Sequence, residues 1–234
     1  MTLRNIEGML TALVLPVVMM LMFVYLFGGA INTGTSYVDY VVPGVLLVCI
    51  GWGASTTAIT VAHDLASGII DRFRSMDVRG EALIAGHVVA SVARNLLSAG
   101  LVIAVAFAIG FRPHADAVHW LLAIGTLGLF VLALSWLAAA IGIVARTPEM
   151  AQGIAFLVSF IPYVSSAFVP VHTMPSVLRG VAANQPATAV ADTIRAALNG
   201  GHVGVDAWHA ALWSVGIIVV SIALSGILFR RRAR

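Results

Sequence analysis

The chain has 234 residues, of which 60% are hydrophobic and only 10% are charged. Soluble domains are about half apolar and about a quarter charged, so this composition excludes an ordinary soluble enzyme or binding domain. A mean hydropathy of +1.01 instead predicts an all-α integral membrane protein with little chain outside the bilayer.

The basic residues are all Arg, and the sequence contains no Lys. A Walker A loop needs its Lys to hold the β- and γ-phosphates, so the chain cannot itself carry that ATP site. The pI near 9.6 does not indicate nucleic-acid binding, because the Arg residues are dispersed or lie beside apolar segments. Membrane topology explains such a distribution better.

Apolar stretches long enough to cross a membrane recur along the whole chain. Crossing a hydrocarbon core of about 30 Å takes about 20 predominantly apolar residues, and about six stretches meet this length. They are residues 9–31, 37–62, 88–111, 120–145, 151–171 and 207–229. The first is too long and too poorly flanked for a cleaved secretory signal. We expect Pro162 and Pro170 to bend the fifth near its outer half.

The distribution of Arg between alternate sides of these spans sets the orientation. Ten lie on the side of both termini, and three lie on the other side, at positions 112, 179 and 195. Because cytoplasmic loops carry the excess of basic residues, we expect both termini in the cytoplasm.

The first longer polar segment covers residues 63–87, on the cytoplasmic side. Its apolar residues recur at three- and four-residue spacing, as on an amphipathic helix at the membrane surface. Two interpretations stay open: an interfacial helix that anchors a loop, or a docking element with Phe73 and Met76 as apolar anchors.

The second longer polar segment covers residues 172–206, on the outer side. Met174-Pro175 predicts the start of a short helix that Asn184-Gln185-Pro186 breaks, and a second is predicted from about 188 to 198. The pair could form a cap, a re-entrant hairpin or a surface loop over the bundle.

The sequence offers no catalytic or metal-binding constellation, and we expect neither an enzyme nor a cofactor site. It contains no H-E-x-x-H helix and no G-x-S-G pattern, and His114 and His119 lack a third ligand. The single Cys49 lies in an apolar run and is expected to be a buried small hydrophobe.

The middles of the predicted spans are almost free of ionisable residues, which a proton-coupled carrier would need there. Arg94, early in the third span, is expected to reach the inner interface, with Glu81 or Asp77 within reach. The scarcity of such residues indicates that energy for any transport comes from outside the chain.

Two regions carry a specific family resemblance that covers nearly the whole chain. The run Gly68-Ile69-Ile70-Asp71-Arg72-Phe73-Arg74-Ser75-Met76 resembles the cytoplasmic loop of ABC-type exporter permeases, more narrowly of the daunorubicin/doxorubicin-resistance-like family. A second region resembles the outer loop of the same family. It comprises Ser165-Ser166-Ala167-Phe168-Val169-Pro170, Met174-Pro175 and Asn184-Gln185-Pro186, with Ala191-Asp192, Arg195 and Gly200.

The chain departs from the family before the first span. Members usually have a longer amphipathic segment there, whereas about eight residues precede the span here. We expect either a downstream start or a shortened segment.

The resemblance implies a single permease domain over residues 1–234, multi-pass in a plasma membrane and of bacterial type. It implies two protein partners: a cytoplasmic ATP-binding-cassette ATPase subunit and a second permease, either another copy or a related chain, that completes a dimer. The residues expected to couple to the ATPase are Asp71, Arg72, Phe73, Arg74, Ser75 and Met76.

The function that follows is export of a hydrophobic or amphipathic antibiotic, drug or lipid, driven by the separate ATPase. The alternative is a secondary carrier or membrane scaffold that is not coupled to ATP.

Overall fold

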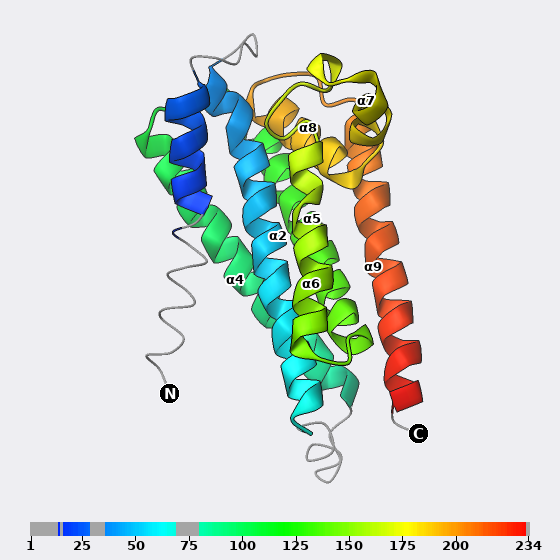
Figure 1. Ribbon diagram of the computed structural model, residues 1–234. Coiled ribbons are helices and arrows are strands. Elements are labelled where there is room, and N and C mark those ends of the chain that lie inside the picture. Colours follow the sequence, from blue (N-terminus) through cyan, green and yellow to red (C-terminus); the bar gives the residue numbers. More distant parts are fainter. Residues whose placement is uncertain (1–13, 15, 29–35, 69–79, 233–234) are drawn as a thin grey trace.

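The computed structural model describes residues 14, 16–28, 36–68 and 80–232, and in these ranges it contains helices and loops without strands (Figure 1). Within them, four helices are long and apolar enough to cross a membrane. They are α2 (Tyr37–Ala66), α4 (Gly80–Ala108), α5 (Ala117–Val144) and α9 (Val205–Arg232). The second, third, fourth and sixth predicted stretches are therefore confirmed as helices of spanning length.

The core lies along α2 and α5. The most hydrophobic windows of these two helices are 72% and 67% buried, against 33% for α4 and 17% for α9. α9 packs along α5, and α4 packs against both α2 and α5. Cys49 of α2 is 3% exposed, which confirms the expected buried thiol.

The first predicted stretch is described only in part. A short apolar helix covers Pro16–Leu26, and its last turn widens to a π-helix, η1 (Phe23–Phe27). Met20 is buried in the main core, so this helix packs onto the bundle. The rest of the predicted 9–31 span lies mostly outside the described residues.

The fifth predicted stretch, 151–171, is wrong as one continuous span. Helix α6 (Pro148–Ser159) has 12 residues and is followed by a 3-10 turn, η2 (Ile161–Val164). At about 1.5 Å per residue, α6 spans about 18 Å and falls short of a bilayer core. Pro162 explains the break, because it has no N–H for an α-helical bond and its ring clashes with the preceding turn.

Short helices fill the connection between η2 and α9, as predicted. After η3 (Val171–Thr173) come α7 (Ser176–Ala183) and α8 (Pro186–Leu198), and Gly200 follows α8 at a φ of +71°. α8 is not a surface loop, because most of its residues are buried against α2, α5 and α9. Figure 1 places α7 and α8 at the end of the bundle where α2 begins.

The opposite end of the bundle holds the C-terminal end of α2, the start of α4 and the C-terminal end of α9 (Figure 1). The amphipathic helix predicted between α2 and α4 falls on residues 69–79, which lie outside the described residues.

Candidate functional site

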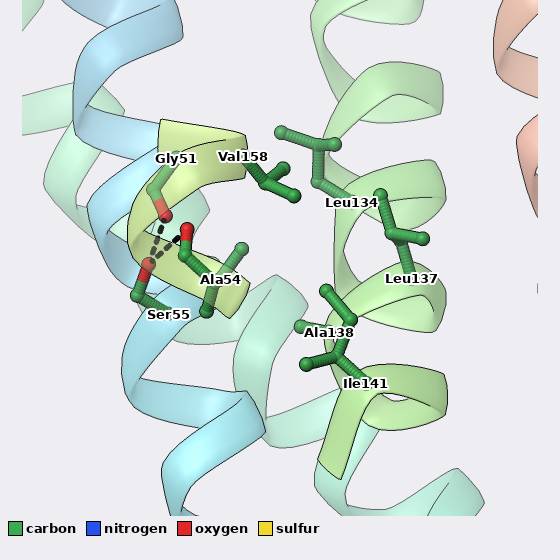
Figure 2. Close-up of a pocket in the computed structure, with 9 residues that line it drawn as sticks. Gly51, Ala54, Ser55, Leu134, Leu137, Ala138, Ile141 and Val158 are labelled. Atoms are coloured by element: carbon green, nitrogen blue, oxygen red, sulfur yellow. Dashed lines mark hydrogen bonds between the residues drawn. The ribbon is translucent and has the colours of Figure 1, made fainter. Parts of the chain in front are cut away.

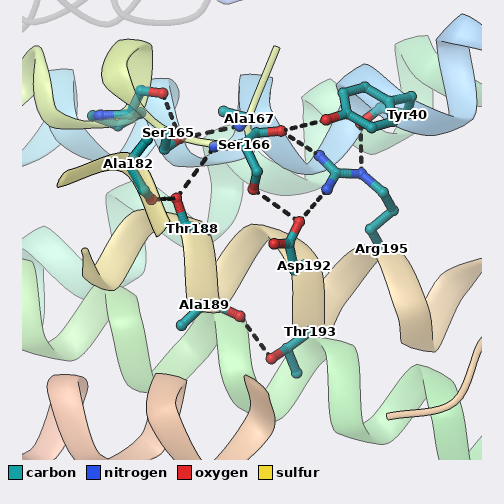
Figure 3. Close-up of polar contacts among 11 residues, drawn as sticks. Tyr40, Ser165, Ser166, Ala167, Ala182, Thr188, Ala189, Asp192, Thr193 and Arg195 are labelled. Carbon is teal, nitrogen blue, oxygen red and sulfur yellow. Dashed lines mark hydrogen bonds and ion pairs between the residues drawn. The ribbon is translucent and has the colours of Figure 1, made fainter. Parts of the chain in front are cut away.

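The residues of the outer family-like motif come together in a polar cluster between α2, α8 and the segment after η2 (Figure 3). Arg195 of α8 donates from Nε to the Tyr40 carbonyl at 3.2 Å and from Nη2 to the Ser166 carbonyl at 2.9 Å. Its Nη1 forms an ion pair with Asp192, and its guanidinium carbon lies 3.8 Å from the centroid of the Tyr40 ring. Arg195 therefore ties three separate chain segments together.

Asp192 is satisfied from two directions in this cluster. Besides pairing with Arg195, it accepts a hydrogen bond from Ser166 Oγ at 2.8 Å. Desolvation by burial raises the pKa of Asp192, although the Arg195 charge and the Ser166 hydroxyl act to lower it. With its hydrogen bonds internally satisfied, the cluster serves to hold together the end of the bundle where α2 begins.

A chain of aromatic rings runs from the middle of α2 to the outer polar cluster. Consecutive ring centroids are 6.3, 4.7, 5.4, 5.5 and 4.4 Å apart, distances at which aromatic pairs attract each other. Phe156 and Phe160 are 46% and 44% exposed, so part of this chain of rings is open to the surroundings. In order, the rings are Trp52, Phe156, Phe160, Tyr163, Phe168 and Phe23.

The contact of α2, α5 and α6 is closed to ligands. Figure 2 shows its residues around a cavity of about 10 Å³, which has room for no more than one water. Ser55 Oγ donates toward the carbonyls of Gly51 and Ala155, each at 3.2 Å, and lies 2.7 Å from Ser159 Oγ. This contact is packing between helices rather than a binding pocket.

A layer of polar side chains joins α2, α4 and α5 inside the bundle. Ser91 Oγ of α4 lies at its centre, 2.8 Å from Thr57 Oγ1, 3.0 Å from Ser135 Oγ and 3.3 Å from Asn95 Nδ2. These four residues are at most 2% exposed. Buried hydroxyl and amide groups that bond to one another fix the register of the helices that carry them.

Arg94 is not where the sequence suggested. It lies 14 residues after the start of α4 at Gly80, about 21 Å along the helix, and not near the N-terminal end of α4. Its Nη2 donates to Thr57 Oγ1 at 3.0 Å. The expected contact between Arg94 and Glu81 is wrong, because nearly half the length of α4 separates the two residues. Asp77 lies outside the described residues.

The C-terminal end of α2 and the N-terminal part of α4 are joined by a polar contact that sequence reasoning missed. His87 Nε2 lies 3.1 Å from Asp64 Oδ2, with side chains 18% and 25% exposed. The only sequence signal was that the two residues lie at opposite ends of the same polar segment, residues 63–87. The predicted coupling residues, Asp71 to Met76, all lie outside the described residues.

His119, one of the two His residues noted in the sequence, contacts Asp116 in the structure. His119 Nδ1 lies 2.7 Å from Asp116 Oδ1 at the start of α5, where Asp116 also caps the helix by accepting from the His119 N–H. In the described ranges, no group of three His, Cys, Asp or Glu residues is arranged to hold a metal ion.

A bundle with several apolar helices of spanning length defines a multi-pass membrane protein. The chain belongs to the ABC-2 type transporter family, whose model matches residues 2–199. It is similar to the daunorubicin resistance ABC transporter permease protein DrrB1 of Streptomyces coeruleorubidus, with 28% identity over 207 residues, 88% of this chain and 70% of that protein.

The family match confirms the resemblance found in the sequence. An ABC-2 membrane domain is the permease part of a transporter and lacks ATPase activity, which confirms that this chain is not the ATP-hydrolysing component. ABC-2 permeases generally pair with ABC ATPase subunits.

Proposed function

We propose that the chain is the membrane subunit of an ATP-driven exporter of hydrophobic or amphipathic molecules, such as an antibiotic, drug or lipid. The observation that carries this proposal is the ABC-2 match over residues 2–199 of a chain that has no Lys for a Walker A site. The motor is then a separate ATP-binding-cassette subunit in the cytoplasm of a bacterial cell, and the permease works in the plasma membrane.

The topology proposed for this function has six spans with both termini in the cytoplasm. The ten-to-three asymmetry of Arg supports that orientation. The end of α9 lies at the same end of the bundle as the end of α2 and the start of α4, which is consistent with it (Figure 1). The short helix α6 and the turn η2 together would take the place of the fifth span.

A dimer is part of the proposal. The exposed apolar faces of α4 and α9 are larger than those of α2 and α5. These faces are available for contact with lipid and with a second permease. The partner permease would be another copy of this chain or a related one.

The ATPase docking element is proposed at residues 71–76, in the link between α2 and α4. The contact of Asp64 with His87 joins the two helices directly beside this link. Movement of a docked ATPase would therefore reach α2 and α4 together.

The proposed substrate class rests on two observations. The half-exposed rings of Phe156 and Phe160 offer an apolar aromatic surface partway along the bundle. The similar protein DrrB1 is named for daunorubicin resistance, and an apolar or amphipathic drug is consistent with such a surface.

Co-purification with the ATP-binding-cassette subunit tests the proposal. Phe73→Asp and Arg74→Glu are expected to abolish association and the ATP hydrolysis that it stimulates. Arg146→Glu is the matched control, because it reverses an exposed charge in the turn between α5 and α6. Full association of the Phe73 and Arg74 variants would refute the docking assignment. Transport that persists without the ATPase would instead favour the secondary carrier.

A further inference from the structure

One side of the α2–α4 pair carries polar residues that the function proposed above does not use. The two helices run antiparallel, because Thr57 contacts Ser91 near the middle of the pair and Asp64 contacts His87 near its inner end. When two helices pack antiparallel, a residue that precedes an interface residue on one helix points to the same side of the pair as a residue that precedes an interface residue on the other helix. Thr56, which precedes Thr57, and Arg94, which precedes Asn95, therefore share a side.

Helix α5 covers the opposite side. Val92, which follows the interface residue Ser91, packs against the cluster that contains Ala139 and Ile143 of α5. The side that holds Thr56 and Arg94 consequently faces away from α5.

The residues on the open side form a polar stripe, which we define as Thr56, Thr60 and His63 of α2 with Arg94 of α4. All four are exposed, and the His63 side chain is 71% exposed. Their spacing of four and three residues along α2 places them on one helical face. The Thr56 and Thr60 hydroxyls donate back to carbonyls of their own helix at 2.8 Å. The groups that the stripe offers to a ligand are therefore the hydroxyl oxygens, as acceptors, and the N–H groups of Arg94, as donors.

Among the described residues, Arg94 is the charge in this stripe that has no counter-charge. A guanidinium has five N–H donors and stays protonated in proteins. One nitrogen, Nη2, donates to Thr57 Oγ1, and none of the ion pairs among the described residues includes Arg94. A charge exposed midway along a spanning helix is costly against hydrocarbon, and such residues normally face water or a ligand.

We propose that Arg94 binds the anionic oxygen group, a carboxylate or phosphate, of an amphipathic substrate at this polar stripe. The fork of guanidinium donors matches two oxygens of such a group, and Thr57 holds the guanidinium in place from behind. The inference rests on the proposed function, since it narrows the transported class to acidic amphiphiles.

A cysteine-protection experiment on the full chain tests the assignment. In a Cys49→Ala background, Thr60→Cys reports on the stripe, and Val219→Cys, at a position of α9 that is 60% exposed, reports on a lipid-facing surface. The chain is placed in phosphatidylcholine nanodiscs and treated with a membrane-impermeant thiol reagent. The probes are dodecanoate and its neutral analogue dodecanol.

The expected result is modification of Thr60→Cys but not of Val219→Cys. Dodecanoate at about ten times its dissociation constant leaves about a tenth of the sites free, so modification slows about tenfold, whereas dodecanol has no effect. Arg94→Gln removes the protection, and Arg94→Lys retains part of it. Ala90→Glu, which leaves Arg94 in place and adds a carboxylate one turn before it, also removes the protection and serves if Arg94→Gln does not fold.

The assignment is overturned if Thr60→Cys is unreactive, as burial by a second copy would make it, or if dodecanol protects as well as dodecanoate. Protection that survives in Arg94→Gln overturns it as well. Protection by phosphatidylglycerol added to the nanodisc, but not by dodecanoate, assigns the site to lipid headgroups and overturns a substrate role. Because no ATPase is present, each of these results is independent of the docking test above.

Discussion

A Cβ atom on Gly53 of α2 would lie 1.8 Å from Oδ1 of Asn95 on α4. The absence of a side chain at Gly53 therefore lets the Asn95 amide fit between the two helices. From that position Asn95 Nδ2 reaches Ser91 Oγ at 3.3 Å, which connects the close approach to the polar layer. Small residues at such crossings allow membrane helices to pack where no hydrophobic force drives them together.

Gly53→Ala is expected to destabilise the bundle by about 1–3 kcal/mol, because the added methyl group overpacks the contact with Asn95. Unfolding in detergent, followed by circular dichroism, measures the effect. Gly100→Ala on α4 is the matched control, since its new Cβ would have no atom within 4 Å. The double change Gly53→Ala with Asn95→Ala should recover part of the loss. Equal stability of Gly53→Ala and the control would contradict the steric argument.

Ser91→Ala is expected to destabilise the chain by about 1–3 kcal/mol, because it leaves buried polar groups of Thr57, Asn95 and Ser135 without their shared partner. Thr56→Ala is the comparison, since the one bond of that exposed hydroxyl to a described residue is to the carbonyl of Gly53 on its own helix. The same unfolding measurement applies, and a loss no larger than that of Thr56→Ala would show that the layer contributes little.

Hydropathy was enough to predict four of the spanning helices, because a bilayer allows few other structures for long apolar runs. It was not enough to place Arg94. The predicted third span began at Val88, where the hydrophobic run begins, whereas α4 starts at Gly80. The intervening residues include good helix formers and no proline, so the helix continues beyond its apolar part. Helix ends depend on caps and breakers, and hydrophobicity alone does not report them.

The outer cluster shows the opposite case. Ser166, Asp192 and Arg195 were singled out by family resemblance, and the fold brings them into direct contact across 26 and 29 residues of sequence. No local pattern predicts the fourth participant, Tyr40 in the first turn of α2, whose hydroxyl donates to the Ser166 carbonyl at 2.8 Å. Contacts of that separation come from packing of the whole chain, which a periodicity in one segment does not contain.

Asp192 is expected to make stability depend on pH. Burial raises the pKa of Asp192 above its ordinary value of 3.8, so the folded state favours the protonated carboxyl. Its contribution is complete below about pH 4 and is lost as the pH rises through the raised pKa. Melting temperatures of wild type and Asp192→Asn, measured between pH 4 and 8 in the same detergent, should show a decline that the variant lacks.

Asp116 provides a control of opposite sign for that experiment. Hydrogen bonds from His119 lower the pKa of Asp116 at the start of α5, so its contribution is present at neutral pH and lost on acidification. That loss occurs below about pH 4, so the control extends the measurement down to about pH 2, where Asp116→Asn should flatten the acid side of the curve. If Asp192→Asn reproduces the wild-type curve over the whole range, titration of Asp192 is not linked to folding.

The contact between Asp64 and His87 is expected to carry movement from the ATPase into the bundle. It joins the last turns of α2 to the first turns of α4, on either side of the proposed docking element. Asp64→Asn and His87→Gln should keep the ATPase bound but lower substrate transport per ATP hydrolysed, because the two helices no longer move as one unit. Transport and hydrolysis measured together in proteoliposomes give this ratio. Ser67→Ala is the control, since within the described part of the chain that exposed hydroxyl bonds only to the Asp64 carbonyl. If the double variant loses no more than either single variant, the two side chains act through their mutual contact, whereas an unchanged ratio in all three assigns them a purely structural role.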